Sequence, residues 1–265
     1  MSKIIDFHAH IYPQKIVEKA TESVGNFYGI SMGHDGSVET LLKSGEKASV
    51  DAYVVHSVAT VPHQVESINN FIAQSCTEHP GKLIGFGTLH PEMENPEMEM
   101  DRCISLGLRG IKLHPDFQKF NMDDPKMGPV YRAAAQKGLP ILMHCGDYRY
   151  DYSHPRRLAA VLDNFPELTI IAAHFGGWSV FDLAVEYLLH RNCYLDTSSA
   201  IFMLGRQRTK ELIQLYGADR ILWGTDFPMG DHTDELEAFQ SFGLSKEDAE
   251  KILYKNAEKI LQISV

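Results

Sequence analysis

Ile4-Ile5-Asp6-Phe7-His8-Ala9-His10 is a short apolar run near the start of the chain that ends in a His-x-His pair. The run is short and rich in β-branched residues, which favours a buried strand over a helix. Residues two apart on a strand point to the same face. The stretch therefore predicts a first strand from whose carboxyl end two imidazole groups project side by side.

Later apolar runs end in the same way, in a histidine or an aspartate. Three of these terminal residues, His114, His144 and His174, are spaced 30 residues apart, and Asp196 and Asp226 repeat that spacing. One strand, one helix and two short loops take up about 30 residues. The spacing indicates that each polar residue occupies the same place in successive β-α units.

Eight strands can be predicted from such runs. They end near His10, His56, His90, His114, His144, His174, Asp196 and Asp226. Helical patterning covers 38–48, 65–78, 96–106, 125–137, 154–164, 180–190, 204–216, 234–242 and 245–261, the last opened by a predicted N-cap at Ser245. This alternation in about 250 residues predicts an α/β fold, a (β/α)₈ barrel, as a single domain over 1–265. A doubly wound open sheet competes, but it does not explain polar residues at nearly every strand end.

Composition limits the partners and the compartment. The 265 residues carry a formal charge of −10, which argues against nucleic acid or an anionic membrane surface as a partner. The apolar runs are too short for a membrane span or a signal peptide. The four cysteines lack Cys-x-x-Cys spacing, which is typical of reduced thiols. We expect a cytoplasmic protein with a small-molecule substrate, and the sequence leaves assembly into a homo-oligomer open.

The strand-end motifs form an ordered set. They are Asp6-Phe7-His8-Ala9-His10, Gly110-Ile111-Lys112-Leu113-His114-Pro115, His144-Cys145-Gly146, His174-Phe175-Gly176-Gly177 and Gly224-Thr225-Asp226-Phe227-Pro228. This set resembles the amidohydrolase superfamily, specifically the amidohydrolase-related branch that includes aminocarboxymuconate-semialdehyde decarboxylase and predicted TIM-barrel hydrolases. The resemblance implies a divalent metal ion held by His8, His10, His144 and Asp226. Imidazole ligands suit zinc, and manganese is the alternative. It implies that His174 is a further ligand or the catalytic base.

The same residue types suit catalysis by a metal-activated water. A metal ion with three or four nitrogen or oxygen ligands and one open position lowers the pKa of bound water to about 7. Asp226 can accept the proton of that water, and His174 can bond the water or polarise the substrate. We therefore expect a metal-dependent hydrolase that cleaves an ester, lactone or amide bond of a small polar molecule, with Asp226 and His174 as catalytic residues.

Two other functions use the same ligands. The first is non-oxidative decarboxylation of an aromatic or unsaturated acid, a carbon-carbon lyase reaction in which His174 or Asp226 handles the proton. The second is a metal-binding barrel without turnover, against which the carboxylate of Asp226 argues, because a purely structural site needs no base. The sequence does not separate hydrolysis from decarboxylation.

Several further polar residues lie close to the strand ends. We expect His114, Asp116, Arg149 and Arg156 to bind the substrate, since arginine forms bidentate pairs with carboxylates. His56 and His90 share the strand-end position, but nothing else favours a functional role for them over a structural one. His232 and the other loop and helix histidines are expected to be solvated.

A single metal ion is expected instead of two. Many relatives in the superfamily bridge two ions through a carbamylated lysine or a glutamate at the end of the fourth strand, where Lys112 is the only nearby lysine. Lys112 lies two residues, about 6.6 Å, deeper along the strand than His114. We expect it to pair with a buried carboxylate such as Asp6.

Overall fold

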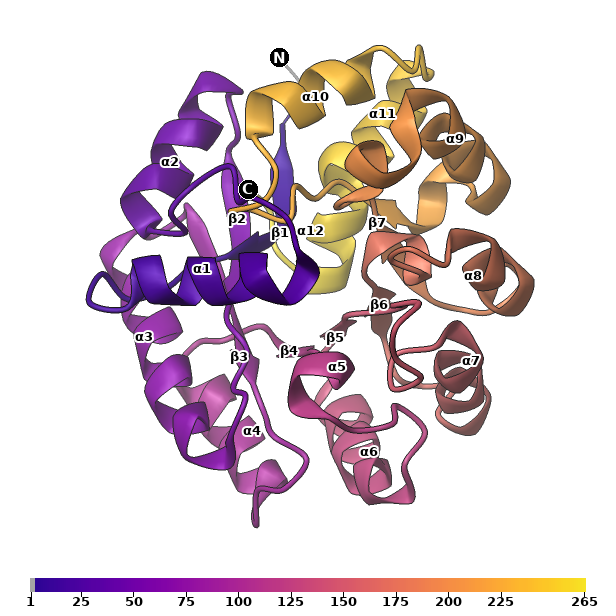
Figure 1. Cartoon of the computed structure of the whole chain (residues 1–265). Helices are drawn as coiled ribbons and strands as arrows, with labels where there is room; N and C mark the ends of the chain where they lie inside the picture. Colours follow the sequence, from indigo (N-terminus) through magenta and orange to yellow (C-terminus); the bar gives the residue numbers. More distant parts are fainter. Residues whose placement is uncertain (1–2) are drawn as a thin grey trace. The chain divides into compact units, whose positions relative to one another are not determined.

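Strands and helices alternate along the chain in the predicted order. A computed structural model describes residues 3–265. The strands are β1 (Ile5–His10), β2 (Ala52–His56), β3 (Leu83–Thr88), β4 (Gly110–Leu113), β5 (Ile141–Met143), β6 (Ile170–Ala172), β7 (Tyr194–Asp196) and β8 (Ile221–Leu222). They form one eight-stranded sheet in the order β1 to β8, which confirms the (β/α)₈ barrel (Figure 1).

The helices agree with most of the predicted segments. They are α1 (Val17–Tyr28), α2 (Val38–Lys47), α3 (Val65–Glu78), α4 (Pro96–Ser105), α5 (Pro115–Gln118), α6 (Gly128–Lys137), α7 (Pro155–Asn164), α8 (Phe181–Leu188), α9 (Ala200–Tyr216), α10 (His232–Gln240), α11 (Lys246–Glu250) and α12 (Asn256–Leu261). Helices α1 and α5 were not predicted. The last predicted helix is divided, because a π-helical turn at Lys251–Lys255 separates α11 from α12.

The described chain divides into two compact units. The first contains the residues up to Ser57, Gln74–Ile84 and Thr197–Val265, and the second contains Val58–Ala73 and Gly85–Asp196. That residues 1–265 act as one domain stays a prediction. No helix of the described residues is long and apolar enough to cross a membrane.

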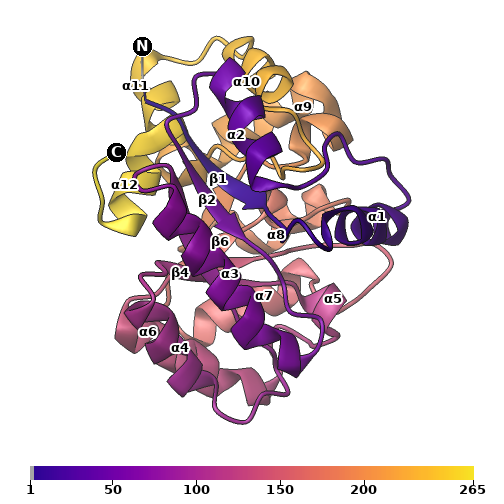
Figure 2. The same cartoon turned by 90° about the vertical axis from the view of Figure 1, so that its left-hand side faces the viewer.

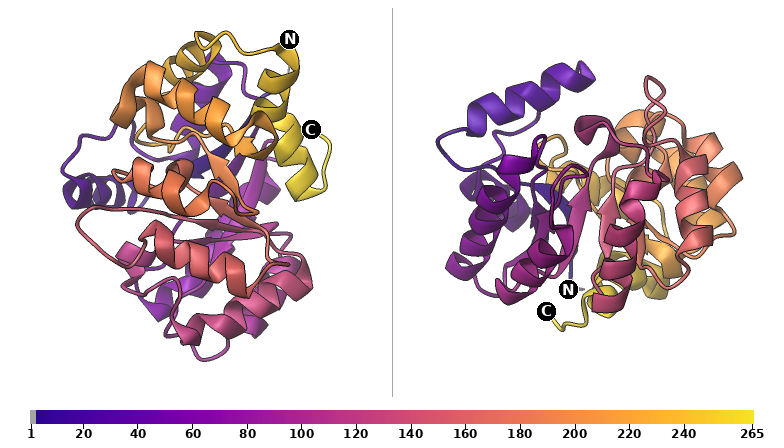
Figure 3. Two further views of the ribbon diagram at one scale, coloured as in Figure 1. Left: turned by 90° about the vertical axis from the view of Figure 1, so that its right-hand side faces the viewer. Right: turned by 90° about the horizontal axis from the view of Figure 1, so that it is seen from below.

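In the first unit, helices cover β1, β2 and β8. Helices α2 and α10 lie side by side (Figure 2), and α9, orange in Figure 3, contacts α10. The segment after β8 runs along β1: the Asp226 amide donates to the His8 carbonyl at 2.9 Å, and the His10 amide donates to the Phe227 carbonyl at 2.7 Å. These bonds place Asp226 next to the His-x-His pair.

In the second unit, β4 to β7 pair in parallel, and α5 to α8 lie on the connections between them, whereas α4 precedes β4. Helices α7 and α8 lie side by side (Figure 1). The loops after β5 and β6 touch through their backbones, since a Cβ on Gly146 would lie 2.6 Å from the Cα of Gly177. Gly146 has a φ of 80°, so both its conformation and its surroundings favour glycine.

Candidate metal centre and active site

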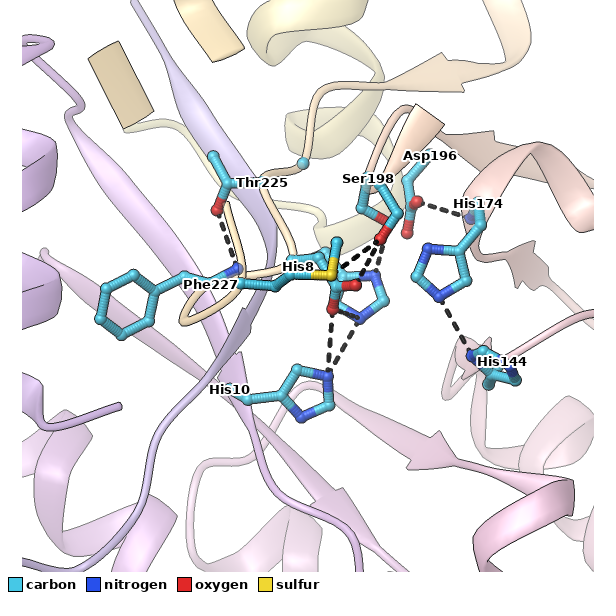
Figure 4. Close-up of polar contacts among 12 residues, drawn as sticks. His8, His10, His144, His174, Asp196, Ser198, Thr225 and Phe227 are labelled. Atoms are coloured by element: carbon cyan, nitrogen blue, oxygen red, sulfur yellow. Dashed lines mark hydrogen bonds and ion pairs between the residues drawn. The ribbon is translucent and has the colours of Figure 1, made fainter. Parts of the chain in front are cut away.

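Three potential metal ligands converge in the first unit. The Nε2 atoms of His8 and His10 are 3.2 Å apart, and they lie 3.3 and 3.5 Å from Oδ1 of Asp226 (Figure 4). Two imidazole nitrogens and one carboxylate oxygen form a donor set that suits zinc and related divalent ions. The cluster is largely buried, with His8 fully enclosed at the end of β1. The residues present therefore fit a divalent metal ion.

Two serines orient these ligands. Ser198 Oγ lies 3.1 Å from Nδ1 of His8, and Ser199 Oγ donates to Oδ2 of Asp226 at 2.6 Å. When Nδ1 of His8 carries its proton, the lone pair of Nε2 can bind a metal ion. A metal-binding histidine commonly engages its other nitrogen in this way. The second carboxylate oxygen of Asp226 is likewise held, so Oδ1 faces the histidines.

His56 belongs to the same cluster. It ends β2, pairs with His10 in the sheet register and is fully buried. Its ring centroid is 4.4 Å from that of His10 and 5.0 Å from that of His8. One potential ligand nitrogen from each of these three histidines lies within 4.8 Å of the others. The sequence alone did not favour a functional role for His56. In the structure, its position at the end of β2 places it beside the potential metal ligands His8 and His10.

The second unit holds another polar cluster. His144 Nδ1 lies 3.0 Å from His174 Nε2 (Figure 4), and His114 stacks on His144 with ring centroids 3.9 Å apart. Asp116 Oδ2 lies 3.5 Å from Nε2 of His144. The amide of His174 donates to Oδ1 of Asp196 at 2.9 Å, which fixes the start of the loop after β6. Asp196, at the end of β7, thus supports the backbone that carries His174.

Asp116 is a buried carboxyl group with one unsatisfied oxygen. Its Oδ2 accepts a hydrogen bond of 2.7 Å from Ser153, whereas Oδ1 has no hydrogen-bond partner among the described residues. Burial raises the pKa of Asp116 to about 7. Near neutral pH this group can therefore donate or accept a hydrogen bond at Oδ1.

The two predicted arginines are in ion pairs. Arg149 contacts the buried carboxylate of Asp147 through Nη2 at 2.6 Å and lies over the ring of Trp178. Arg156 pairs at 2.5 Å with Asp151 on the surface. Arg149 is thus held by an ion pair with a buried carboxylate in the loop after β5. Arg156 is held by an ion pair at the exposed edge of that loop.

His232 does not follow the sequence prediction. It is completely buried instead of solvated, and its Nε2 lies 3.0 Å from Oδ2 of Asp6. A buried imidazole is tolerated here because a carboxylate accepts its hydrogen bond. The available signal was Asp6 itself, which shares a strand face with His8 and His10 and would need donors in the interior.

Comparison with known proteins gives consistent matches along the chain. The family model described as Amidohydrolase matches residues 5–263. The gamma-resorcylate decarboxylase of Polaromonas sp. (strain JS666 / ATCC BAA-500) is 25% identical over an alignment length of 284 residues. The alignment covers 86% of this chain and 84% of that protein. The 2-amino-3-carboxymuconate-6-semialdehyde decarboxylase of Dictyostelium discoideum is 24% identical over 237 residues, covering 73% of this chain and 65% of that protein.

A solved structure shows the same fold. The 5-carboxyvanillate decarboxylase of Novosphingobium aromaticivorans DSM 12444, complexed with manganese and 4-hydroxy-3-methoxy-5-nitrobenzoic acid, superposes with a TM-score of 0.78 at 16% identity. The match covers 99% of this chain and 96% of that structure. Fold, strand-end motifs and a family match over nearly the whole length agree, and they confirm the resemblance: this chain belongs to the amidohydrolase family.

Proposed function

We propose that this protein is a metal-dependent, non-oxidative decarboxylase of a small aromatic or unsaturated carboxylic acid. The observation that carries the proposal is that the relatives matching most of the chain are decarboxylases. This similarity favours decarboxylation over the hydrolysis of an ester, lactone or amide that the motifs alone suggested. The protein is thus better described as a carbon-carbon lyase of the amidohydrolase superfamily.

His8, His10 and Asp226 are the proposed core of the metal site, with His144 and His174 as further ligands. The parallel strand order supports this set, because the active-site residues of a (β/α)₈ barrel follow the carboxyl ends of its strands. When bound, the divalent ion would orient an acidic substrate and offset its negative charge. The similar structure that contains manganese supports Mn²⁺ as a candidate beside Zn²⁺.

The reaction needs one proton and no redox partner. The bond to the carboxylate carbon breaks, its electron pair stays on the substrate carbon, CO₂ leaves, and a proton is added to that carbon. His174 and Asp226 are the proposed proton carriers: His174 is in hydrogen-bonding distance of His144, and Asp226 is held by Ser199.

The remaining polar groups would bind the substrate. His114 presents a ring stacked on His144, and Asp116 offers its unsatisfied oxygen to a hydroxyl or carboxyl group. Arg149 pairs with the buried carboxylate of Asp147 through Nε and Nη2, which orients its guanidinium group, and a guanidinium group forms bidentate pairs with carboxylates. Arg156 would have to leave Asp151 to reach a substrate, so we rank it below Arg149.

The test compares two reactions on one preparation. The chain is stripped with a chelator, reloaded with Mn²⁺ or Zn²⁺, and assayed for CO₂ release from dihydroxybenzoic and carboxyvanillic acids and for hydrolysis of lactones and esters. We expect metal-dependent CO₂ release that is lost in Asp226→Asn. Lactone hydrolysis without CO₂ release would restore the hydrolase interpretation, and tight metal binding without either reaction would support a non-catalytic barrel.

A further inference from the structure

The carboxylate of Asp6 is saturated by hydrogen bonds inside the first unit. Oδ1 accepts from the amides of His8 at 3.0 Å and Thr225 at 3.1 Å. Oδ2 accepts from the Thr225 hydroxyl at 2.7 Å and from Nε2 of His232 at 3.0 Å. A carboxylate has about four lone-pair sites, and all of them are used here. These four donors, and not the expected Lys112, satisfy Asp6.

Three of those four donors belong to the segments that carry proposed metal ligands. One is the amide of His8 itself, and the other two are the amide and the hydroxyl of Thr225, which immediately precedes Asp226. The Thr225 hydroxyl also accepts from the amide of Phe227 at 3.1 Å (Figure 4), so the turn that carries Asp226 is held from both sides. One carboxylate therefore joins the two chain segments that present His8 and Asp226.

His232 fixes that carboxylate from the outer helix layer. Because Asp6 offers only acceptors, Nε2 of His232 must carry the proton of their contact. Nδ1 of His232 lies 2.8 Å from the hydroxyl of Ser44 on α2, and that hydroxyl lies 3.2 Å from Asp231, which caps α10. The ring is thus held at both nitrogens, by β1 and by α2.

We propose that Asp6 and His232 are positioning residues for the metal site: Asp6 clamps the backbones of the His8 and Asp226 segments, and His232 locks Asp6 in place. The inference rests on the proposed metal dependence, but the clamp itself consists of contacts within one unit. Neither side chain is among the proposed metal ligands or substrate-binding groups. Removing either should loosen the approach of His8 Nε2 to Asp226 Oδ1, which is 3.3 Å in the intact site.

The test measures metal affinity separately from stability. Apo protein is titrated with Mn²⁺ alone, and the free ion is read by electron paramagnetic resonance, for wild type, Asp6→Asn, His232→Leu and His232→Gln. Partners that orient metal ligands typically contribute about 10- to 100-fold in affinity, and we expect that loss in Asp6→Asn and His232→Leu. His232→Gln, which retains an N–H donor, should recover part of it.

Leu236→Ala is the matched control. Leu236 is also buried on α10, but its apolar side chain cannot donate a hydrogen bond to Asp6, so this variant should lower the melting temperature and leave Mn²⁺ affinity unchanged. Equal Mn²⁺ affinity in His232→Leu and wild type would overturn the proposal. So would an equal loss of affinity in Leu236→Ala and His232→Leu at matched melting temperatures, because His232 would then act through stability alone.

A third readout separates the clamp from the proposed function. If the wild-type protein binds no Mn²⁺, the proposed metal-dependent function is wrong. Hydrogen exchange of the His8 and Thr225 amides in the apo protein still tests whether Asp6 and His232 hold these two segments. Faster exchange of both amides in His232→Leu, but not in Leu236→Ala, supports it. Unchanged exchange in His232→Leu contradicts it.

Discussion

The backbone of Asp226 has a φ of 59°, a left-handed conformation that asparagine and aspartate adopt more readily than most residues. Asp226→Asn should therefore fold normally and retain most of the metal through its amide oxygen. Turnover should nearly vanish, because an amide cannot accept or deliver the proton. Metal analysis and CO₂ release on the same sample measure both effects. Near-normal turnover would assign the proton to His174.

His8→Ala is the contrasting variant at the same site. It removes an imidazole nitrogen that lies 3.2 Å from His10 and 3.3 Å from Asp226, so the metal content itself should fall. The same metal analysis as for Asp226→Asn gives the comparison. A His8→Ala protein with full metal content would remove His8 from the ligand set.

Glu235 on α10 gives a prediction for stability against pH. Burial, reinforced by Asp6 and Asp226, raises the pKa of Glu235 to about 8, and its Oε2 has no hydrogen-bond partner among the described residues. Between its unfolded pKa and pH 8 the folded state holds a proton that the unfolded state has released, so the free energy of unfolding falls as pH rises.

Replacing that carboxyl group should remove the effect. Glu235→Gln stays neutral, so the variant should gain stability relative to wild type as pH rises from 5 to 9, by an amount on the order of a few kcal/mol at most. Thermal unfolding of the metal-free proteins at several pH values provides the measurement. If the melting temperatures of the two proteins changed with pH in parallel, the ionisation of Glu235 would not destabilise the folded state.

Residue types and strand-end positions predicted the potential metal ligands better than the residues that hold those ligands in place. The His8–His10–Asp226 cluster follows from strand alternation and from the turn after β8. Asp6 indicated that a buried donor was needed, but the sequence could not identify His232 as that donor, because this depends on the fold bringing the start of α10 to Asp6. A local pattern shows that a residue is polar, but it does not show whether the fold will supply a partner.

At the level of elements, the helices with strong apolar periodicity were predicted within a few residues. Helix α1 was missed because its buried face consists of Val17, Thr21 and Gly25, which form no apolar stripe. Helix α5 has only four residues and is capped by the His114 side chain, which accepts from the Phe117 amide. Helix α9 begins earlier than predicted and changes direction at Gly205.

Helix α2 depends on a glycine for its approach to β2. A Cβ on Gly45 would lie 1.8 Å from the hydroxyl of Tyr53, whose side chain is buried. Alanine favours a helix by about 1 kcal/mol over glycine, but forcing atoms into a packed interior costs about 1–3 kcal/mol or more. Gly45→Ala should therefore lower the free energy of unfolding despite its better helix propensity.

Denaturant unfolding of three proteins tests this. Gly45→Ala combined with Tyr53→Phe removes the oxygen at 1.8 Å, although the ring carbon at 2.5 Å remains, so the double variant should recover only part of the lost stability. Greater stability of Gly45→Ala than of wild type would show that α2 can shift away from β2 at little cost.

On the scale of the whole molecule, the recurrence of a histidine or an aspartate at the end of each apolar run predicted the order of the eight strands. A 30-residue repeat holds for His114, His144 and His174 and again for Asp196 and Asp226, because one β-α unit takes up about that length. Strand ends are less regular: β8 stops at Leu222, and Asp226 follows four residues later in a turn hydrogen-bonded to β1. The turn is a tertiary feature, so the repeat located Asp226 without describing how it is held.

The number of metal ions per chain is the remaining prediction at this scale. Lys112 lies on β4 between Ile111 and Leu113, and all three side chains are fully buried. His114, which directly follows the last residue of β4, stacks on His144 in the polar cluster. A bridging carbamate on Lys112 would have to form at the deeper position, about 6.6 Å below His114 along the strand.

We therefore expect one equivalent of Mn²⁺ or Zn²⁺ per chain and an unmodified Lys112. Metal analysis of the loaded protein gives the number of ions per chain, and mass spectrometry of the native protein shows whether CO₂ is attached to Lys112. Lys112→Met, which retains length without the amine, should still bind one equivalent. Two equivalents in wild type that fall to one in Lys112→Met would establish a bridged pair of ions, and the positioning of the site by Asp6 and His232 would then apply to only one of them.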